Sequence, residues 1–453
     1  MRALTCSLLL VVTGCSETRP SNVVIVVVDT LRFNHLGCYG YERNTSPSVD
    51  RFAEEAIRFD RAYASSSWTQ PSVASMLTGL HPGAHTVFRM ERSLPDAAET
   101  LAEILKDEGY ATAAVVSHRL IGSGTNFDQG FEVFDELHAK GYRYRSTPGV
   151  TAKAIALLED FADNERPFFL LVHYFDPHYN YNRHAAFGFA PKSAGRLKGT
   201  ESIKKLRALP DPTQAEIGLV KGLYDEEVRY TDQGFGRLLA ALDELGLKDE
   251  TMIVFTADHG EEFYERGWLG HTRTLYEEII RVPFLVRMPN GRNGGEVVRD
   301  QVSLVGLTPT VLDIMGVDAT GREYDGASFA PLILGRRGYA PSPIFAEVDF
   351  ADRPTEPEPG EPPSKKVRKR ALIQGGFKLV QDLFTGNTEL YDLERDPLES
   401  VDLAGERPDI VEAMAPKLDA ISEHARADSL LLEERVISEE ELEALRSLGY
   451  VGQ

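Results

Sequence analysis

The stretch NVVIVVVD, Asn22 to Asp29, is a run of mostly β-branched residues that ends in an aspartate. An unbroken apolar run of this length is typical of a strand buried on both faces, as in a parallel sheet. Similar runs and segments of helical spacing follow along the chain (strands at 168–172, 251–257 and 282–288; helices at 48–59, 101–108 and 224–246). We therefore expect an α/β fold with a mixed, mainly parallel sheet flanked by helices.

Acidic and histidine side chains follow three of these runs where each run ends. They are Asp29 after the first run, His173, Asp176 and His178 after FFLLV, and Asp258 and His259 after TMIVFTA. The carboxyl ends of parallel strands share one edge of the sheet, where ligands bind. A lone aspartate after a strand is usually a turn former or a helix cap. Several such groups from distant segments instead predict a metal site at this edge.

Several hydroxyls precede a short helix in the segment SSSWTQPSVASMLTGLHPG, Ser65 to Gly83. Pro71 suits the first turn of a helix, and Gly79 suits the left-handed position that ends one. Thr69 is then expected at the helix N-terminus, where free N–H groups and the helix dipole favour a negatively charged oxygen. Two interpretations stay open: Thr69 caps the helix through its side chain, or it is a nucleophile.

The composition excludes some classes of function. The formal charge of −21 over 453 residues argues against a nucleic-acid partner, because phosphate contacts need a basic face. The sequence contains neither a GxxxxGK[ST] motif nor a GxGxxG motif after a strand, so nucleotide binding is not indicated.

The N-terminus predicts export. The segment MRALTCSLLLVVTGC, Met1 to Cys15, has one arginine and then an apolar run too short to span a bilayer. Its end, VTGC, resembles a bacterial lipobox, so we expect a signal peptide at 1–14, lipid on Cys15 and a linker at 15–21. Membrane attachment would come only through this lipid, with the protein facing the periplasm, at the outer membrane of a Gram-negative bacterium. An ordinary signal peptide is the alternative.

A family resemblance accompanies these patterns. The blocks that carry it are VVDTLRFNHLGCYGY, TSPSVDRFAEEAIRF, PSVASMLTGLHP, FLLVHYFDPH, FTADHGEEF, HTRTLYEEIIRVPFLVRMP and GFKLVQDLFTGNTELYDLERDPLESVDLA. In this order they resemble the sulfatase family of the alkaline phosphatase superfamily. The resemblance implies a catalytic domain at 22–335 and, at 336–453, a small antiparallel α+β subdomain with a helical tail. The Pro- and Glu-rich segment Asp349–Arg370 is predicted to be a surface loop.

The resemblance also implies roles for individual residues. It implies one divalent cation (Ca, Mg, Mn or Zn) and a nucleophile at Thr69. The metal ligands would be Asp29, Thr69, Asp258 and His259; the catalytic residues Thr69, His178 and His271; the substrate-binding residues His173, His118 and Arg273. The substrate would be a small molecule or glycan ester.

The chain departs from the family at the nucleophile. Sulfatases carry C-x-P-S-R or S-x-P-S-R, whose first residue is oxidised to formylglycine, whereas this chain has TQPSV, Thr69 to Val73. No formylglycine is therefore expected, and a threonine ester must be cleaved at its central atom. This favours phosphodiester, phosphomonoester or phosphonate hydrolysis. The alternatives are a sulfuric ester hydrolase, a phosphoglycerol or phosphoethanolamine transferase on envelope glycans, and an inactive glycan-binding lipoprotein.

Overall fold

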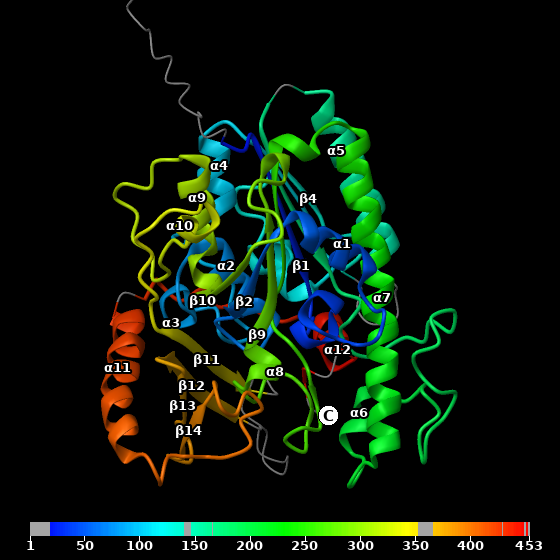
Figure 1. Cartoon of the computed structure of the whole chain (residues 1–453), viewed down its shortest axis with the longest axis vertical. Helices are drawn as coiled ribbons and strands as arrows, with labels where there is room; N and C mark the ends of the chain where they lie inside the picture. Colours follow the sequence, from blue (N-terminus) through cyan, green and yellow to red (C-terminus); the bar gives the residue numbers. More distant parts are fainter. Residues whose placement is uncertain are drawn as a thin grey trace, which may run out of the picture.

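The computed structural model describes residues 19–139, 146–164, 166–351, 366–427, 429–447 and 450–451. An eight-stranded sheet forms its centre, in the order β10-β2-β9-β6-β1-β5-β3-β4 (Figure 1). Its strands are β1 Asn22–Val28, β2 Ile57–Tyr63, β3 Ala111–Val115, β4 Val133–Asp135, β5 Phe168–Tyr174, β6 Thr251–Ala257, β9 Arg281–Arg287 and β10 Val297–Ser303. β1 pairs in parallel with β5 and β6, while β9 runs antiparallel to β2 and β6. The expected mixed, mainly parallel sheet is confirmed.

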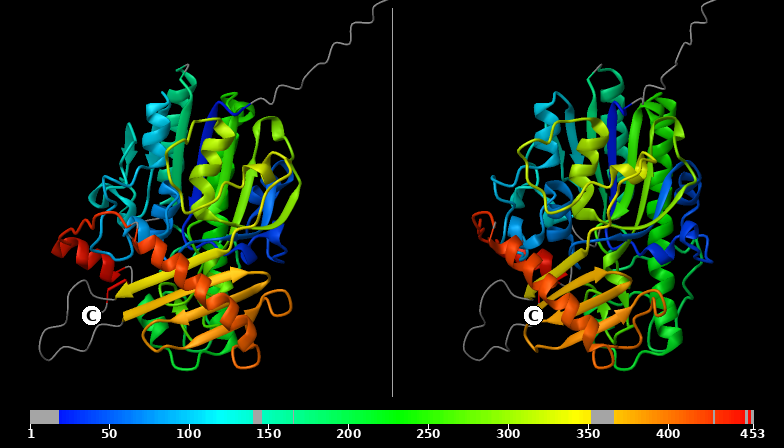
Figure 2. Two further views of the ribbon diagram at one scale, coloured as in Figure 1. Left: turned by 90° about the vertical axis from the view of Figure 1, so that its left-hand side faces the viewer. Right: turned by 60° about the vertical axis from the view of Figure 1, so that its left-hand side comes forward.

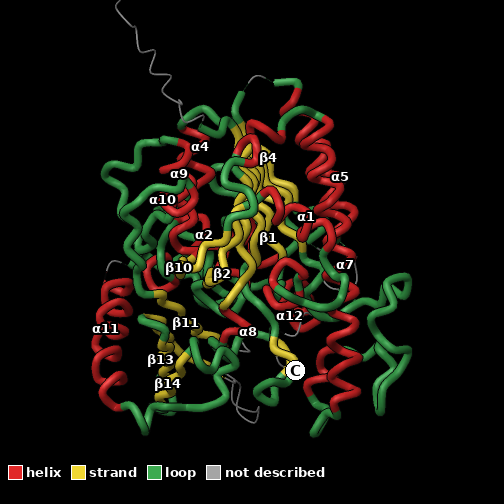
Figure 3. Tube along the Cα trace, viewed as in Figure 1, coloured by secondary structure: helices red, strands yellow, loops and turns green. Residues whose placement is uncertain are grey.

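Helices cover both faces of this sheet (Figures 1 and 3). One face carries α1 Pro47–Glu55, α5 Thr147–Ala162 and α7 Gln214–Glu244, and the other carries α2 Thr69–Thr78, α4 Leu101–Asp107 and α9 Leu307–Met315. Shorter elements connect them: α3 Pro82–His85, α6 Ile203–Arg207, α8 Glu277–Ile280, α10 Ala330–Ile333 and the two-stranded ribbon β7 Glu262–Phe263 with β8 Leu269–Gly270. Because helices cover both faces, β1, β5 and β6 are buried along their whole length.

Two predicted helix boundaries are wrong. The helix expected over 48–59 ends at Glu55, and Ile57 begins strand β2. Ile57 and Phe59 are fully buried while Arg58 between them is partly exposed, which is the period of a strand. The helix expected from residue 224 begins ten residues earlier, because Thr213 and Glu216 form a capping box at its start.

A second, smaller sheet lies beyond the first (Figure 2). It contains β11 Ile344–Ala351, β12 Lys366–Gln374, β13 Phe377–Asp382 and β14 Thr388–Asp392, all antiparallel. Helix α11 Pro408–Ala427 packs on it, and α12 Glu439–Ser447 follows. The expected C-terminal antiparallel subdomain is confirmed. The loop predicted at Asp349–Arg370 is shorter, because both its ends belong to strands, and 352–365 lie outside the described residues.

The predicted signal peptide and Cys15, which is predicted to carry lipid, also lie outside the described residues. Within the part of the chain that the structure describes, no helix has the length and apolar character needed to cross a bilayer.

Candidate active site

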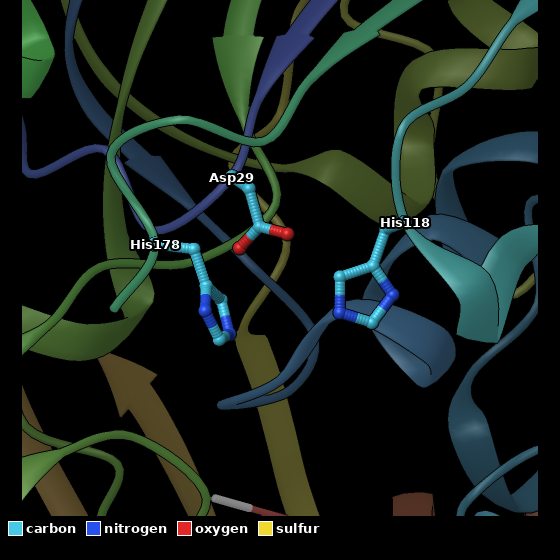
Figure 4. Close-up of side chains that lie close together, drawn as sticks. All are labelled: Asp29, His118 and His178. Atoms are coloured by element: carbon cyan, nitrogen blue, oxygen red, sulfur yellow. The ribbon is translucent and has the colours of Figure 1, made fainter. Parts of the chain in front are cut away.

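Four neighbouring strands place their functional residues at one edge of the large sheet. Asp29 follows β1, Asp258 and His259 follow β6, His118 lies three residues beyond β3, and His173 is the penultimate residue of β5. All five side chains are at most 1% exposed. Figure 4 shows Asp29 between the rings of His118 and His178. The ends of these neighbouring strands thus bring the residues together at one edge of the sheet.

Asp29 belongs to two groups of side chains that could hold a metal ion. Its partners are His173 and Asp258 in one group and His118 and His178 in the other, with ligand atoms in each group within 4.8 Å of one another. His259 adjoins the first group, since its Nε2 lies 3.4 Å from Asp258 Oδ2 and 3.9 Å from Asp29 Oδ1.

The hydrogen bonds around these ligands leave lone pairs facing one another. Asp258 Oδ1 accepts the N–H groups of Thr30 and His259, whereas its Oδ2 and both Asp29 oxygens are buried without a partner. The ring of His259 donates from Nδ1 to the Gly260 carbonyl at 2.8 Å, so the lone pair of Nε2 faces these oxygens. The Thr69 hydroxyl and the ring of His173 are the neighbouring groups that could donate to them, and three buried carboxylate oxygens this close together are unfavourable unless a cation lies between them. The donor set therefore fits a divalent cation.

The pKa of Asp29 reflects the same crowding. Burial raises it well above its ordinary value, and the nearby carboxylates of Asp258 and Glu261 raise it further. A cation among these oxygens would act in the opposite direction and keep Asp29 ionised.

Thr69 is the first residue of α2, and its side chain does not cap the helix. Trp68 occupies the N-cap position, so the interpretation of Thr69 as a side-chain cap is wrong. Instead Thr69 Oγ1 lies 3.4 Å from His259 Nε2, beside the metal-ligand group. Ser72 Oγ donates to the Asp258 carbonyl at 2.6 Å and ties the first turn of α2 to the end of β6. Gly79 ends the helix with the expected positive φ, 75°.

His118, His178 and His271 line the same space from three segments. The ring centroids of His178 and His271 are 4.9 Å apart, and those of His118 and His178 are 5.8 Å apart. Burial lowers the pKa of all three well below the ordinary value. At neutral pH these rings are therefore uncharged and can exchange hydrogen bonds with a bound group.

Two other residues singled out from the sequence contact partners outside the metal-ligand groups. Asp176 accepts the N–H groups of Ser146 and Thr147 at 2.7 Å and holds the start of α5, so it is a helix-capping residue rather than a metal ligand. Arg273, expected to bind substrate, stacks on Trp268 with its guanidinium carbon 3.4 Å from the ring centroid.

The structure adds three residues that the sequence reasoning missed. Glu261 contacts His271 Nδ1 at 2.9 Å, and burial raises its pKa to about 8. Arg207 stacks on Tyr179 at 4.8 Å and lowers the pKa of His178 and His271 electrostatically. Tyr450 is 1% exposed and contacts three of the histidines. Glu261 lies two residues after His259 and was within reach of the strand-end argument, whereas nothing local marks Arg207 or Tyr450.

Comparison with protein families covers most of the chain. The sulfatase family model matches residues 21–317, and the model described as N-sulphoglucosamine sulphohydrolase, C-terminal, matches residues 264–424.

Individual relatives agree with these matches. The chain is 25% identical to human arylsulfatase A over 494 residues, which covers 90% of this chain and 89% of that protein. It is also 25% identical to the N-acetylglucosamine-6-O-sulfatase of Bacteroides thetaiotaomicron, with coverage of 86% and 83%.

Solved structures share the fold. A structure in complex with its substrate D-glucosamine-2-N,6-O-disulfate superposes with a TM-score of 0.73 at 21% identity, over 90% of this chain and 99% of that one. The phosphonate monoester hydrolase of Agrobacterium radiobacter superposes with a TM-score of 0.69 at 20% identity, over 93% and 99%.

Proposed function

The chain belongs to the sulfatase family of ester hydrolases, and on this basis we propose that it hydrolyses sulfate esters of small sugars or glycans with Thr69 as the nucleophile. The substrate class is supported by the relatives, which are mainly sulfatases and include an enzyme named for N-acetylglucosamine 6-O-sulfate. The sequence pattern alone had favoured phosphoesters, and the comparisons favour the sulfuric-ester alternative instead.

One observation carries the assignment of the nucleophile. Thr69 Oγ1 begins a helix, where the dipole favours a negative oxygen, and it lies 3.4 Å from His259 in the metal-ligand group. A divalent cation held by Asp29, Asp258 and His259 would polarise the ester and lower the pKa of the Thr69 hydroxyl. We expect Ca, Mg, Mn or Zn, because mixed carboxylate and imidazole ligands suit several metals.

Different residues of the chain carry out the successive steps of the reaction. Thr69 Oγ1 gives its proton to an uncharged histidine of the site and attacks the central sulfur, and the bond from sulfur to the leaving oxygen breaks. His118, His178 and His271 surround the leaving oxygen, and the protonated histidine returns the proton to it. Water then attacks the same sulfur, the bond from sulfur to Thr69 Oγ1 breaks, and a proton from the water restores the Thr69 hydroxyl. Burial of these groups excludes bulk water and strengthens each polar interaction.

Phosphonate and phosphate esters are the second candidate class, and the identity of residue 69 favours them. A threonine ester cannot use the elimination that formylglycine allows, and Val73 replaces the arginine of the sulfatase motif. The shared fold with a phosphonate monoester hydrolase agrees with this candidate. Sulfate esters and phosphonate monoesters carry the same single charge. The carboxylates of Asp29 and Asp258 would cancel the charge of the cation, so a singly charged ester fits better than a doubly charged phosphomonoester.

Parallel turnover assays test this proposal. The purified protein is loaded separately with each metal and given 4-nitrophenyl sulfate, glucosamine 6-sulfate, a phenylphosphonate monoester, a phosphodiester and a phosphomonoester. We expect sulfate esters to be turned over fastest and the phosphomonoester slowest. A phosphonate or diester that is faster by tenfold or more assigns the second class. No turnover with any ester and any metal would contradict both classes and favour the inactive glycan-binding alternative.

We also propose that the protein is an exported lipoprotein, on the lipobox-like VTGC at Val12–Cys15. Growth with a radiolabelled fatty acid tests this, with Cys38→Ser as the control. Label is expected in the native protein and the control and absent from Cys15→Ser. Label that persists in Cys15→Ser would refute it.

A further inference from the structure

Tyr450, near the C-terminus of the chain, places its phenol inside the candidate active site. The proposed function places His118, His178 and His271 around the leaving oxygen, and we propose that Tyr450 occupies this subsite as an intramolecular mimic of a phenolic product. The identity of the leaving alcohol rests on the proposed function, whereas the occupancy of the subsite rests on the geometry alone.

Three imidazole nitrogens converge on one oxygen. The Nε2 atoms of His178, His118 and His271 lie 3.2, 3.3 and 3.3 Å from the Tyr450 hydroxyl. A hydroxyl offers one hydrogen and two lone pairs, and the Thr69 hydroxyl is a further hydrogen-bond partner of the Tyr450 oxygen beside these three. A substrate oxygen at this place would have to replace the Tyr450 oxygen.

The Nδ1 atoms of His178 and His118 also form hydrogen bonds, and these determine whether each Nε2 donates to the Tyr450 oxygen or accepts from it. His178 Nδ1 donates to the Tyr179 carbonyl at 2.7 Å, which leaves Nε2 as an acceptor. His118 Nδ1 accepts the Leu120 N–H at 3.1 Å, which leaves Nε2–H as a donor. These partners assign the tautomers, and together they require a bound group that both donates and accepts. An alcohol or phenol does both, whereas a sulfate oxygen only accepts.

The ring of Tyr450 also lies in an aromatic environment. Its centroid is 5.8 Å from those of His118 and His178, 6.3 Å from Phe350 and 6.5 Å from Trp68. Trp68 is the residue directly before Thr69. A phenyl ring placed here thus has aromatic partners on the side that leads to the nucleophile.

The segment that precedes Tyr450 is held against the catalytic part by described contacts. Ser93 donates its N–H to the Glu433 carbonyl at 3.1 Å, and Leu430 donates to the Ala84 carbonyl at 2.9 Å. Arg435 binds the Met90 carbonyl and pairs with Glu441 on α12. These contacts run beside the segment that follows α2, so the tail is anchored independently of Tyr450.

Binding of a phenol to an emptied subsite tests the proposal without turnover. The probe is 4-methylphenol, which reproduces the ring and hydroxyl of tyrosine, and toluene is the matched probe without the hydroxyl. Calorimetry on Tyr450→Ala is expected to show 4-methylphenol binding at least tenfold more tightly than toluene, and at least tenfold more tightly than to the native protein. Equal affinity for both probes, or no binding by a folded variant, would overturn the proposal.

Kinetics of Tyr450→Phe gives a second test that keeps the packing of the ring. Loss of the hydroxyl removes the hydrogen bonds that hold residue 450 in the subsite, so an aryl ester displaces the ring more easily, and its KM should fall several-fold while kcat stays equal or rises. Tyr391→Phe, which removes a buried hydroxyl on β14, is the control and should leave both constants unchanged. A fall in kcat of tenfold or more in Tyr450→Phe would overturn the proposal, because it would make Tyr450 a catalytic residue. If no ester is turned over, calorimetry on the two Tyr450 variants still decides the question.

Discussion

Thr69 is the residue at which the chemistry can be tested most simply. Thr69→Ala should lower kcat by several orders of magnitude, because it removes one member of a cooperating catalytic set. Its thermal stability should stay close to that of the native protein, since the Thr69 side chain makes no capping hydrogen bond. Thr78→Ala, at the other end of α2, is the matched control and should keep full activity. Activity that survives in Thr69→Ala would remove Thr69 from the mechanism.

Asp258 tests the metal site in the same way. Asp258→Asn should abolish stoichiometric metal in the purified protein and lower its melting temperature, because a bound cation stabilises the native state by mass action. Asp176→Asn is the control, since Asp176 is also a buried aspartate near a strand end but caps α5. It should lose stability and retain the metal, as measured by plasma emission spectrometry. Equal metal content in both variants would exclude Asp258 as a ligand.

Among the elements, the contact between α2 and α3 gives a prediction about pH. His85 of α3 contacts Ser75 Oγ of α2 at 3.1 Å, and burial lowers the pKa of His85 to about 3. In the unfolded chain the pKa of this histidine is about 6.5, so below that pH the unfolded chain binds a proton that the folded chain does not bind. Stability should therefore fall as the pH falls below about 6.5, by up to about 1.4 kcal/mol per pH unit for this group. Urea midpoints at pH 7, 6 and 5 should fall less steeply in His85→Gln, and parallel slopes would contradict this.

Element type was easier to predict from the sequence than element boundaries or strand direction. Continuous apolar runs predicted β1, β5 and β6, because strands buried on both faces have no polar side to interrupt them. The boundary between α1 and β2 was misplaced, since Ile57 and Phe59 fit both the helical pattern and a strand. The antiparallel direction of β9 was not predicted, because pairing is a property of neighbours in the sheet that a single run of residues does not encode.

In the whole molecule, the sequence pattern predicted those site residues that directly follow a strand, and it did not predict the others. Asp29, Asp258 and His259 follow one rule, since parallel strands end at a shared edge. Tyr450 reaches the same place from the far end of the chain, through contacts of α12 and the preceding segment that have no local signature. Thr69 stays a predicted nucleophile beside these residues, and its role as a cap could be rejected only from the helix start at Trp68.

The central claim is that a group is transferred to Thr69 before it reaches water. Mass spectrometry of the protein quenched during turnover of the best ester tests it directly, with Thr69→Ala and the substrate-free protein as controls. We predict a sulfuryl or phosphoryl group on the peptide that contains Thr69, absent from both controls. An unmodified Thr69 peptide, in a protein shown to be turning over when it was quenched under conditions that preserve a reference threonine ester, would contradict the account.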